Sequence, residues 1–476
     1  MSKSEKAANI ILGSAAIFFL LIFFYAMYRS HLHPPGQMIK YYILSITGSL
    51  CFTVALLRCD KEMKLKISLL LITTLICIYS FEIILSYKVI NKPEPIREKI
   101  AAETGLPYDS RSGPQVWLDL RNQGIDAYPF YSPYENIEIQ WRDILPLSFI
   151  SGKTTIQCNE SGEWIIYKSD EHGFNNPEGL YIENQLDYVL IGDSFTHGFC
   201  TKREENIAGW LTKTGKRVLN LGMGNTSPLI QLAILKEYGK PFKPKYVFWF
   251  FFEGNDHEGL AFDKKSSILV KYLENDFTQH LLQKQKVIDE LLSEYADEKF
   301  ELIKKDGGIA SKYKREGGPV FSLSFSSIVL SQLRKKLGIS ESCICHVDPL
   351  FKDIFAEAKR TINSWDGKLV FVYLPDYSRY PKRIDKCRKR FLDTGKTGII
   401  KIIKDLEIPV LDIQSVFDSH PDPLSFFPFK LFGHYNADAY KLIAEEIEKY
   451  LSTGGVALGN HSSESMINYP ENRNGA

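Results

Sequence analysis

The sequence has no excess of charge of either sign. Its 58 lysine and arginine residues stand against 57 aspartate and glutamate residues, which gives a formal net charge of +1 at pH 7. Proteins that bind nucleic acid usually carry a basic footprint, so this balance argues against a nucleic-acid partner. The chain also has no internal repeat. At 476 residues it is longer than one compact domain of usual size, and we expect a large core with additional segments.

Cysteine is sparse, and its spacing does not form a metal motif. Among the 8 cysteines, the cluster Cys343-Ile344-Cys345-His346 lacks a second ligand pair at a useful separation in the sequence. We therefore expect no metal, and nothing in the chain implies an organic cofactor. Disulfides among the cysteines after residue 90 are compatible with an oxidising compartment, but the sequence does not define their pairing.

Apolar residues, by contrast, are abundant in the first 90 positions. An apolar run of about 20 residues is long enough to cross a bilayer as a helix. We predict three spans, at about 9–28, 41–57 and 67–87, of which the second is marginal. The first run lacks a small-x-small cleavage site and is followed directly by Tyr28-Arg29, which favours an uncleaved span over a signal peptide.

The charges of the short loops indicate an orientation. The loop between the second and third spans is the most basic, with Arg58, Lys61, Lys64 and Lys66. Because basic loops stay on the cytoplasmic side, we predict a multi-pass protein of the cell (plasma or inner) membrane, in contact with membrane lipid, whose long carboxyl-terminal part is extracytoplasmic. The basic amino terminus competes for the same side, and loss of the marginal span would reverse this orientation.

One short stretch organises the part of the chain after the spans. An apolar run from Tyr188 to Ile191 is typical of a buried strand, and it ends at Gly192. Asp193 and Ser194 follow on a turn that leads into a helix-prone segment. A strand-to-helix turn holds a hydroxyl at the carboxyl edge of a sheet, beside the N–H groups of a helix start. That position suits a nucleophile, although a Gly-Asp-Ser tripeptide alone is more often an ordinary turn.

Further strands and helices alternate after this stretch. We predict strands at about 217–220, 246–252, 368–374 and 408–411, with helices between them. The strand at 246–252 is uniformly apolar and aromatic, as expected of a sheet that is buried on both faces. The pattern predicts an α/β fold with a doubly wound parallel sheet and a site at the carboxyl ends of its strands.

Three further turns supply groups that acyl chemistry needs. An ester carbonyl attacked by a hydroxyl becomes an oxyanion, which aligned N–H donors stabilise. Such donors are offered by the turn with Gly224 and Asn225 and by the turn with Asn255, each at the end of a predicted strand. His434 precedes a helix near the carboxyl end and is placed to act as a general base.

These segments resemble the blocks of the SGNH (also called GDSL) hydrolase family, and the four blocks occur in the family's order. The resemblance covers about residues 187–260 and 366–451. It implies a three-layer, flavodoxin-like domain in which Ser194 is the nucleophile and His434 the base. It further implies that the oxyanion is bound by the backbone N–H of Ser194, a backbone N–H of the second turn and the Asn255 side chain, with Gly192 and Asp193 as supporting motif residues.

The chain departs from the family pattern in three places. The family's second-block glycine falls on Asn225, a residue type that tolerates left-handed backbone. Glu253 stands where the third block usually has glycine. The acid that usually lies three residues before the histidine is replaced by Leu431. We expect Asp422, the nearest upstream carboxylate, to orient His434, unless a backbone carbonyl does so in a Ser–His dyad.

The predicted function is that of a membrane-anchored serine esterase or O-acyltransferase. Its substrate would be an ester-bearing small molecule, or an O-acyl group of a cell-surface glycan or lipid. The alternative is a non-catalytic SGNH-fold module in a membrane-bound glycan-modification assembly, which the missing acid supports. A metal-dependent hydrolase is a third hypothesis and predicts sensitivity to chelators. The sequence does not indicate an oligomeric state.

The predicted domain organisation has four parts. Residues 1–90 form the membrane region, and residues 91–183 form a linker and a lead-in that packs on the catalytic domain. The hydrolase-like domain spans 184–452, with an amphipathic helical insertion at about 260–346 that is either a solvated hairpin or a lid. Residues 453–476 are polar and glycine-rich, and we expect them to be disordered.

Overall fold

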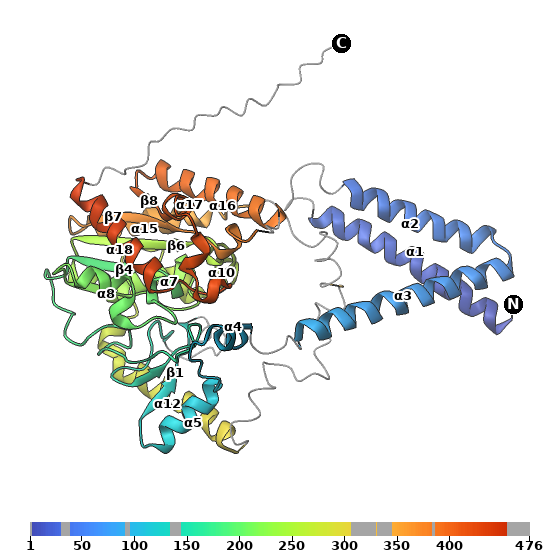
Figure 1. The fold of residues 1–476 in the computed structure, drawn as a ribbon. Coiled ribbons are helices and arrows are strands. Elements are labelled where there is room, and N and C mark those ends of the chain that lie inside the picture. The colour runs from blue at the N-terminus through green and yellow to red at the C-terminus, as the bar shows by residue number, and fades with distance from the viewer. Residues whose placement is uncertain are drawn as a thin grey trace, which may run out of the picture. The chain divides into compact units, whose positions relative to one another are not determined.

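The computed structural model describes residues 2–29, 39–90, 96–133, 144–305, 330, 345–382 and 386–454. The chain forms two compact units, one of Met1–Lys92 with Val320–Ser340 and one of Pro93–Pro319 with Glu341–Ala476 (Figure 1). Residues 91–95 of the predicted linker, the carboxyl-terminal tail from 455 and residues 306–329 and 331–344 of the predicted insertion lie outside the described residues.

Three helices make up the described part of the first unit: α1 (Lys3–Arg29), α2 (Ile39–Arg58) and α3 (Lys61–Ile90). Each is long and apolar enough to cross a membrane, at the places where the sequence predicts spans. Helix α1 packs along α2, for example through the stacked rings of Phe19 and Phe52, whose centroids lie 5.8 Å apart. Most large side chains of the three helices are exposed, as side chains that face lipid would be.

The second unit is built on a five-stranded parallel sheet, which confirms the predicted fold class. Its order is β5-β4-β6-β7-β8. The strands are β4 (Tyr188–Ile191), β5 (Val218–Asn220), β6 (Tyr246–Phe252), β7 (Lys368–Leu374) and β8 (Val410–Asp412). Because β5 lies on one side of β4 and β6 on the other, the strand order reverses at β4. In such sheets the crevice at the carboxyl end of this reversal holds the site.

Helices cover both faces of this sheet and make two hydrophobic cores, because successive strand residues point to opposite faces. One core joins Val189 and Trp249 to helices that include α9 and α15, and the other joins Leu190 and Phe248 to α8 and α18. The helices of three or more turns are α12 (Gln285–Lys305), α15 (Leu350–Asn363), α16 (Lys386–Asp405) and α18 (Ala437–Ser452). The shorter α-helices are α7 (Ser194–His197), α8 (Ile207–Thr212), α9 (Pro228–Ile234), α10 (Asp256–Asp263), α11 (Ser267–Lys271) and α17 (Ile413–Asp418).

Single helical turns complete the unit. They are η2 (Arg203–Glu205), the π-helical η3 (Leu235–Gly239), η4 (Lys240–Phe242), η5 (Leu281–Lys284), η7 (Tyr377–Arg379), η8 (Pro423–Phe426) and η9 (Pro428–Lys430). The last two lie between the final strand, β8, and His434.

The lead-in belongs to the second unit and shares its core. It comprises α4 (Ile96–Thr104), α5 (Gly113–Asn122) and a small sheet of β1 (Ala127–Pro129), β2 (Thr154–Ile156) and β3 (Ile166–Lys168). Strand β2 pairs in parallel with β1 and antiparallel with β3. Buried lead-in residues such as Trp117 join the same core as the main sheet. The lead-in is therefore part of the folded unit that begins at Pro93.

The described part of the insertion also packs on the lead-in. Helix α12 buries Ile288, Leu292 and Ala296, with the apolar spacing that the sequence predicts. Its Phe300 ring lies 5.0 Å from the ring of Trp117 in α5. This helix thus covers the lead-in and the core beneath it.

Candidate active site

Ser194 opens α7, three residues after the end of β4, the strand at which the strand order reverses. The Asp193 side chain caps this short helix by accepting a hydrogen bond from the N–H of Phe195 at 3.0 Å. Gly192 is required by close approach, since a Cβ there would lie 2.1 Å from Thr196 Oγ1 and 2.8 Å from the carbonyl oxygen of Phe250. The turn therefore sets the serine at the carboxyl edge of the sheet, where the sequence predicts it.

The imidazole of His434 reaches this serine. The distance between His434 Nε2 and Ser194 Oγ is 2.9 Å, within the range expected of a nucleophile and its base. The residues after the histidine fix its loop. The buried Tyr435 donates its hydroxyl to the carbonyl of Pro375 at 2.5 Å, and Asn436 caps α18 through the N–H of Ala439 at 3.1 Å. Two segments 240 residues apart in the chain thus meet at one hydroxyl.

The carboxylate beside His434 belongs to Glu160, which lies in the lead-in loop between β2 and β3. Glu160 Oε1 lies 3.2 Å from His434 Nδ1, and Oε2 accepts a hydrogen bond from the His434 backbone N–H at 2.7 Å. The sequence does not predict a role for this residue. No motif marks Glu160, and the only local signal is its place next to Cys158, whose partner cannot be read from the sequence.

The predicted acid, Asp422, does not lie beside His434, so this prediction is wrong. Its carboxylate pairs with Lys430 Nζ at 2.6 Å, and its side chain is 45% exposed. The ion pair lowers the pKa of Asp422 through the hydrogen bond from Lys430. Asp422 lies at the start of η8, where the two proline-flanked turns direct it toward solvent and Lys430.

Glu160 is held in its ionised form. Burial raises the pKa of its carboxyl, but the hydrogen bond from His434, the charge of His434 and the charge of Arg97 together lower it below the ordinary value. Arg97 of α4 lies 3.7 Å from Glu160 Oε2 and donates to the Phe432 carbonyl at 2.6 Å. Gly433 leaves room for this contact, because a Cβ there would lie 2.4 Å from Glu160 Oε2.

These contacts define the tautomer of His434. A carboxylate only accepts hydrogen bonds, so the ring hydrogen lies on Nδ1 and faces Glu160. Nε2 then carries the lone pair and accepts the hydroxyl hydrogen of Ser194. This arrangement can remove a proton from the serine and stabilise the imidazolium that results.

The second turn, after β5, is bound to the first. The N–H of Met223 donates to the Gly192 carbonyl at 3.1 Å. Asn225 is exposed and has a φ of 56°, the left-handed conformation that its residue type tolerates. Gly224 packs on Phe199, whose ring centroid lies 5.2 Å from that of His434. The backbone of this turn therefore lies beside the serine–histidine pair.

The third turn, after β6, places Asn255 next to Asp193. Burial raises the pKa of Asp193 to about 6, while hydrogen bonds from the Phe195 N–H and the Asn255 amide act in the opposite direction. Asp256, the next residue, is buried and accepts the N–H of Phe252 at 2.8 Å. Asn255 thus stands at the end of the strand adjacent to β4, partly exposed.

Glu253, which replaces a glycine of the family pattern, has a structural role. It is 1% exposed and forms a two-pronged ion pair with Arg379, with distances of 2.5 Å from Nε and 2.6 Å from Nη2. It also accepts the N–H of Asp376 at 2.6 Å and the hydroxyl of Tyr373. Through these contacts Glu253 connects the end of β6 with β7 and η7, beside the third turn.

One group among the described residues has the spacing of metal ligands, namely Glu160, Cys200 and His434. Cys200 is joined to Cys158 in a disulfide, however, and a thiolate is the form in which cysteine binds metal. The remaining two groups already contact each other and Ser194. The set fits an acid–base pair better than a metal centre.

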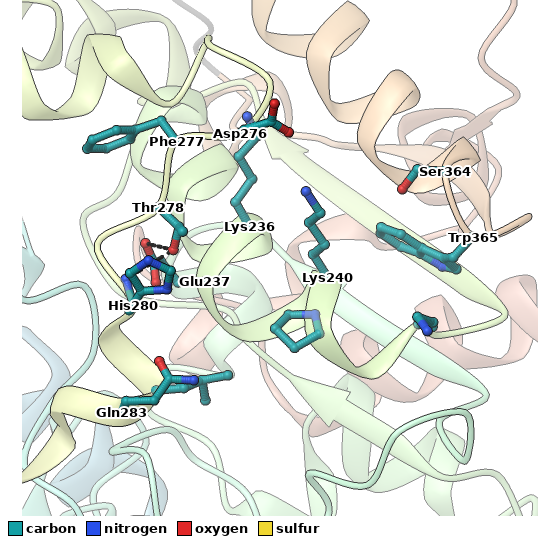
Figure 2. A pocket seen from close by; sticks show the side chains of 13 residues that line it. Lys236, Glu237, Lys240, Asp276, Phe277, Thr278, His280, Gln283, Ser364 and Trp365 are labelled. Atoms are coloured by element: carbon teal, nitrogen blue, oxygen red, sulfur yellow. Dashed lines mark hydrogen bonds between the residues drawn. The ribbon is translucent and has the colours of Figure 1, made fainter.

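A cavity of about 350 Å³ lies elsewhere, near the amino-terminal ends of β6 and β7 (Figure 2). Its lining includes Lys236, Lys240 and Trp365. Lys236 pairs with Glu357 at 2.5 Å. The lining hydroxyl of Thr278 donates to Glu237 at 2.7 Å, and the hydrogen bonds of these described residues include none between a hydroxyl and the ring of His280. The candidate active site is therefore the Ser194 cluster at the opposite edge of the sheet.

Comparison with known proteins gives likenesses of fold only. No family model and no curated protein matches the chain. Similar solved structures include a protein of the G-D-S-L family from Desulfitobacterium hafniense DCB-2, at 16% identity and a TM-score of 0.29 over 55% of this chain and 97% of that one. A second is a lipase/acylhydrolase from Enterococcus faecalis, at 14% identity and a TM-score of 0.30 over 56% of this chain and 96% of that one. A third is an acetylxylan esterase from Geobacillus stearothermophilus, at 10% identity and a TM-score of 0.29 over 57% of this chain and 95% of that one.

Identities and TM-scores of this size carry no weight for the site, which stands on the contacts given above. The site contact is the Ser194–His434 hydrogen bond. It occurs in a sheet with a doubly wound strand order, beside the motif turns that follow β4, β5 and β6. In these features of its own sequence and fold, the chain resembles the SGNH, or GDSL, hydrolases.

Proposed function

We propose that the chain is a membrane-anchored serine esterase or acyl-transfer enzyme of SGNH type. The observation that carries this proposal is the continuous series of contacts from Ser194 Oγ to His434 Nε2 at 2.9 Å and from His434 Nδ1 to Glu160 at 3.2 Å. A serine alone is a weak nucleophile and needs an adjacent, oriented base. All three groups are present, in contact, at the carboxyl edge of the sheet.

The reaction follows from these contacts. Ser194 Oγ attacks the ester carbonyl while His434 takes its proton, and Glu160 stabilises the imidazolium. The carbonyl oxygen becomes an oxyanion that accepts hydrogen bonds from the Ser194 N–H, a backbone N–H at Gly224 or Asn225, and the Asn255 amide. The alcohol leaves with the proton from His434, and an acyl-serine remains. Water then completes hydrolysis, or a hydroxyl of a sugar or lipid completes acyl transfer.

The non-catalytic alternative has lost its main support. It relied on the missing acid before His434 and on Glu253 in the third block. Glu160 lies in the acid position, and Glu253 forms a buried ion pair with Arg379. We propose ester substrates on small molecules, glycans or lipids, with the catalytic unit on the extracytoplasmic side.

The test uses the full chain in detergent micelles with p-nitrophenyl acetate. We expect measurable hydrolysis that Ser194→Ala lowers by at least about 10³-fold, and covalent labelling by a fluorophosphonate that maps to Ser194. A metal chelator should leave the rate unchanged. Equal rates for the wild type and Ser194→Ala would contradict an enzymatic function and favour the non-catalytic module.

A further inference from the structure

The loop that carries Glu160 has no helix or strand of its own to hold it. It runs from Gln157 to Ile165 between β2 and β3. Local hydrogen bonds shape its tip, for example from the Gly162 N–H to Asn159 Oδ1 at 2.8 Å. A loop of this kind is the least stable kind of support for a catalytic group. Its attachment to the rest of the site therefore determines where the carboxylate lies.

The covalent part of that attachment is a disulfide. Cys158, two residues before Glu160, is bonded to Cys200, six residues after Ser194, with a Cα–Cα distance of 5.2 Å. Beside it, the N–H of Cys200 donates to Gln157 Oε1 at 2.9 Å. The bond joins the segment of the acid directly to the segment of the nucleophile. The disulfide and the imidazole of His434 therefore both connect the Glu160 loop with the segment of Ser194.

We propose that the Cys158–Cys200 disulfide is a positioning element for Glu160, so that full activity requires the oxidised enzyme. The inference rests on the proposed function, because Glu160 acts through His434 on Ser194. Neither sulfur takes part in the acyl chemistry. A dithiol reductant would give up two electrons and two protons, convert the bond into two thiols and itself become a disulfide. The Glu160 carboxylate would then keep its contacts with His434 and Arg97, and its loop would keep hydrogen bonds such as that from the Asp109 N–H to the Gly162 carbonyl at 2.8 Å, but the covalent link to the segment of Ser194 would be lost.

The experiment compares Cys158→Ser/Cys200→Ser, Glu160→Gln and the triple variant, as full chains in detergent with p-nitrophenyl acetate. A misplaced catalytic group costs on the order of 10²-fold in rate, so we expect the cysteine pair to lower kcat by about that factor with KM little changed. The triple variant should equal Glu160→Gln, because the disulfide then has no carboxylate to position. If hydrolysis by Glu160→Gln is as slow as that by Ser194→Ala, the variants are compared by the rate at which a fluorophosphonate labels Ser194.

Two controls separate positioning from general stability. Cys387 is also disulfide-bonded, so a dithiol should lower the rate of the wild type but leave the Cys158→Ser/Cys200→Ser variant unchanged. The circular dichroism spectrum of the reduced wild type should match that of the oxidised protein. If the cysteine variant does not fold, the reduced wild type takes its place in the rate comparison.

Three results would overturn the inference. The first is an unchanged kcat without the disulfide, and the second is a further loss in the triple variant equal to that in the wild-type background. The third is a reduced wild type that loses both its activity and its native circular dichroism spectrum, because general unfolding would then explain the loss. A wild type no faster than Ser194→Ala would instead refute the proposed function.

Discussion

Glu160 and His434 are 274 residues apart in the chain, yet the carboxylate contacts the histidine through both its ring and its backbone N–H. Two bonds to one residue hold the orientation of the imidazole more firmly than one would. Arg97 adds a third contact, from a helix that precedes the loop. The acid is thus fixed by lead-in and loop residues that have no counterpart in the motif around His434.

Replacement of this carboxylate should slow the chemical step. We expect Glu160→Gln to lower kcat by about 10² to 10⁴-fold, because the amide cannot stabilise the imidazolium and does not fix the tautomer. Asp422→Asn is the matched control and should leave kcat within about twofold, since its carboxylate pairs with Lys430. Steady-state hydrolysis of p-nitrophenyl acetate measures both. A larger loss for Asp422→Asn than for Glu160→Gln would reverse the assignment.

The Asn255 side chain should act only on the transition state. We expect Asn255→Ala to lower kcat by about 10² to 10³-fold with KM nearly unchanged, as for other oxyanion donors. Asn225→Gly should retain most of the activity, because the turn supplies a backbone N–H and glycine accepts the φ of 56°. A strong loss in Asn225→Gly would show that the Asn225 side chain, not its backbone, takes part.

Ser194 and His434 were predictable at this scale because both lie in short motifs at the ends of regular elements. The acid was not, because its contact depends on tertiary packing and a disulfide that leave no local pattern. Asp422 was the nearest carboxylate in sequence. Nearness in sequence does not determine which groups meet in this loop, because the Asp422 carboxylate forms an ion pair with Lys430 and does not contact His434.

At the scale of elements, a buried ion pair connects the segments that follow the strands near the site. The Glu253–Arg379 pair lies between β6 and η7, with side chains 1% and 4% exposed. Loss of Glu253 would leave the buried Arg379 guanidinium with Asp393 as its ion-pair partner, through Nη1 only, at 2.6 Å. We expect Glu253→Ala to lower the free energy of unfolding by about 3–5 kcal/mol, measured by denaturant titration.

Its control is Glu178→Ala, which removes the exposed pair with Lys168, whose side chains are more than half exposed. That substitution should leave the unfolding midpoint unchanged. Equal effects of the two substitutions would mean that the Glu253–Arg379 pair does not stabilise the unit.

Asp263, at the end of α10, predicts a dependence of stability on pH. Burial raises the pKa of its carboxyl to about 7, although a hydrogen bond from Ser227 opposes this. The unfolded chain ionises near pH 4, so the contribution of this group is complete below that pH and is lost as pH rises toward 7. The slope is about 1.4 kcal/mol per pH unit.

Asp263→Asn should remove this slope. Unfolding of the wild type and the variant at several pH values between 4 and 7 gives the measurement. We expect the difference in stability to grow in favour of the variant as pH rises. A difference that stays constant with pH would show that Asp263 is ionised in the folded protein.

The main strands were predictable because each is an apolar run that ends in a turn. Strand β6 was placed at its observed bounds, and β8 within about two residues. Helix α16 is not among the predicted elements, and the lead-in is predicted only as short strand-like pieces that alternate with turns, one of them at 164–167, where β3 begins at Ile166. The strands of the lead-in sheet have three residues each, too few to show a periodicity, and α16 has an irregular, strongly basic pattern.

At the scale of the whole molecule, the predicted apolar runs all fall on long helices. The full chain should therefore stay in the membrane fraction after an alkaline carbonate wash. The orientation predicts that Cys59, which follows α2 in the basic loop, is cytoplasmic. An impermeant maleimide should label Cys59 only after permeabilisation, and labelling in intact cells would show the reverse orientation.

The position of Glu160 also decides how the catalytic machinery could be moved to another protein. A fragment excised at residue 184, where the motifs begin, would include the hydroxyl and the imidazole but leave the imidazole without its anchor. The transplantable piece starts at α4, because Arg97 and Glu160 both precede the nucleophile. Along the chain the three proposed catalytic groups occur in the order glutamate, serine, histidine, so a search for the acid only downstream of the serine would miss Glu160.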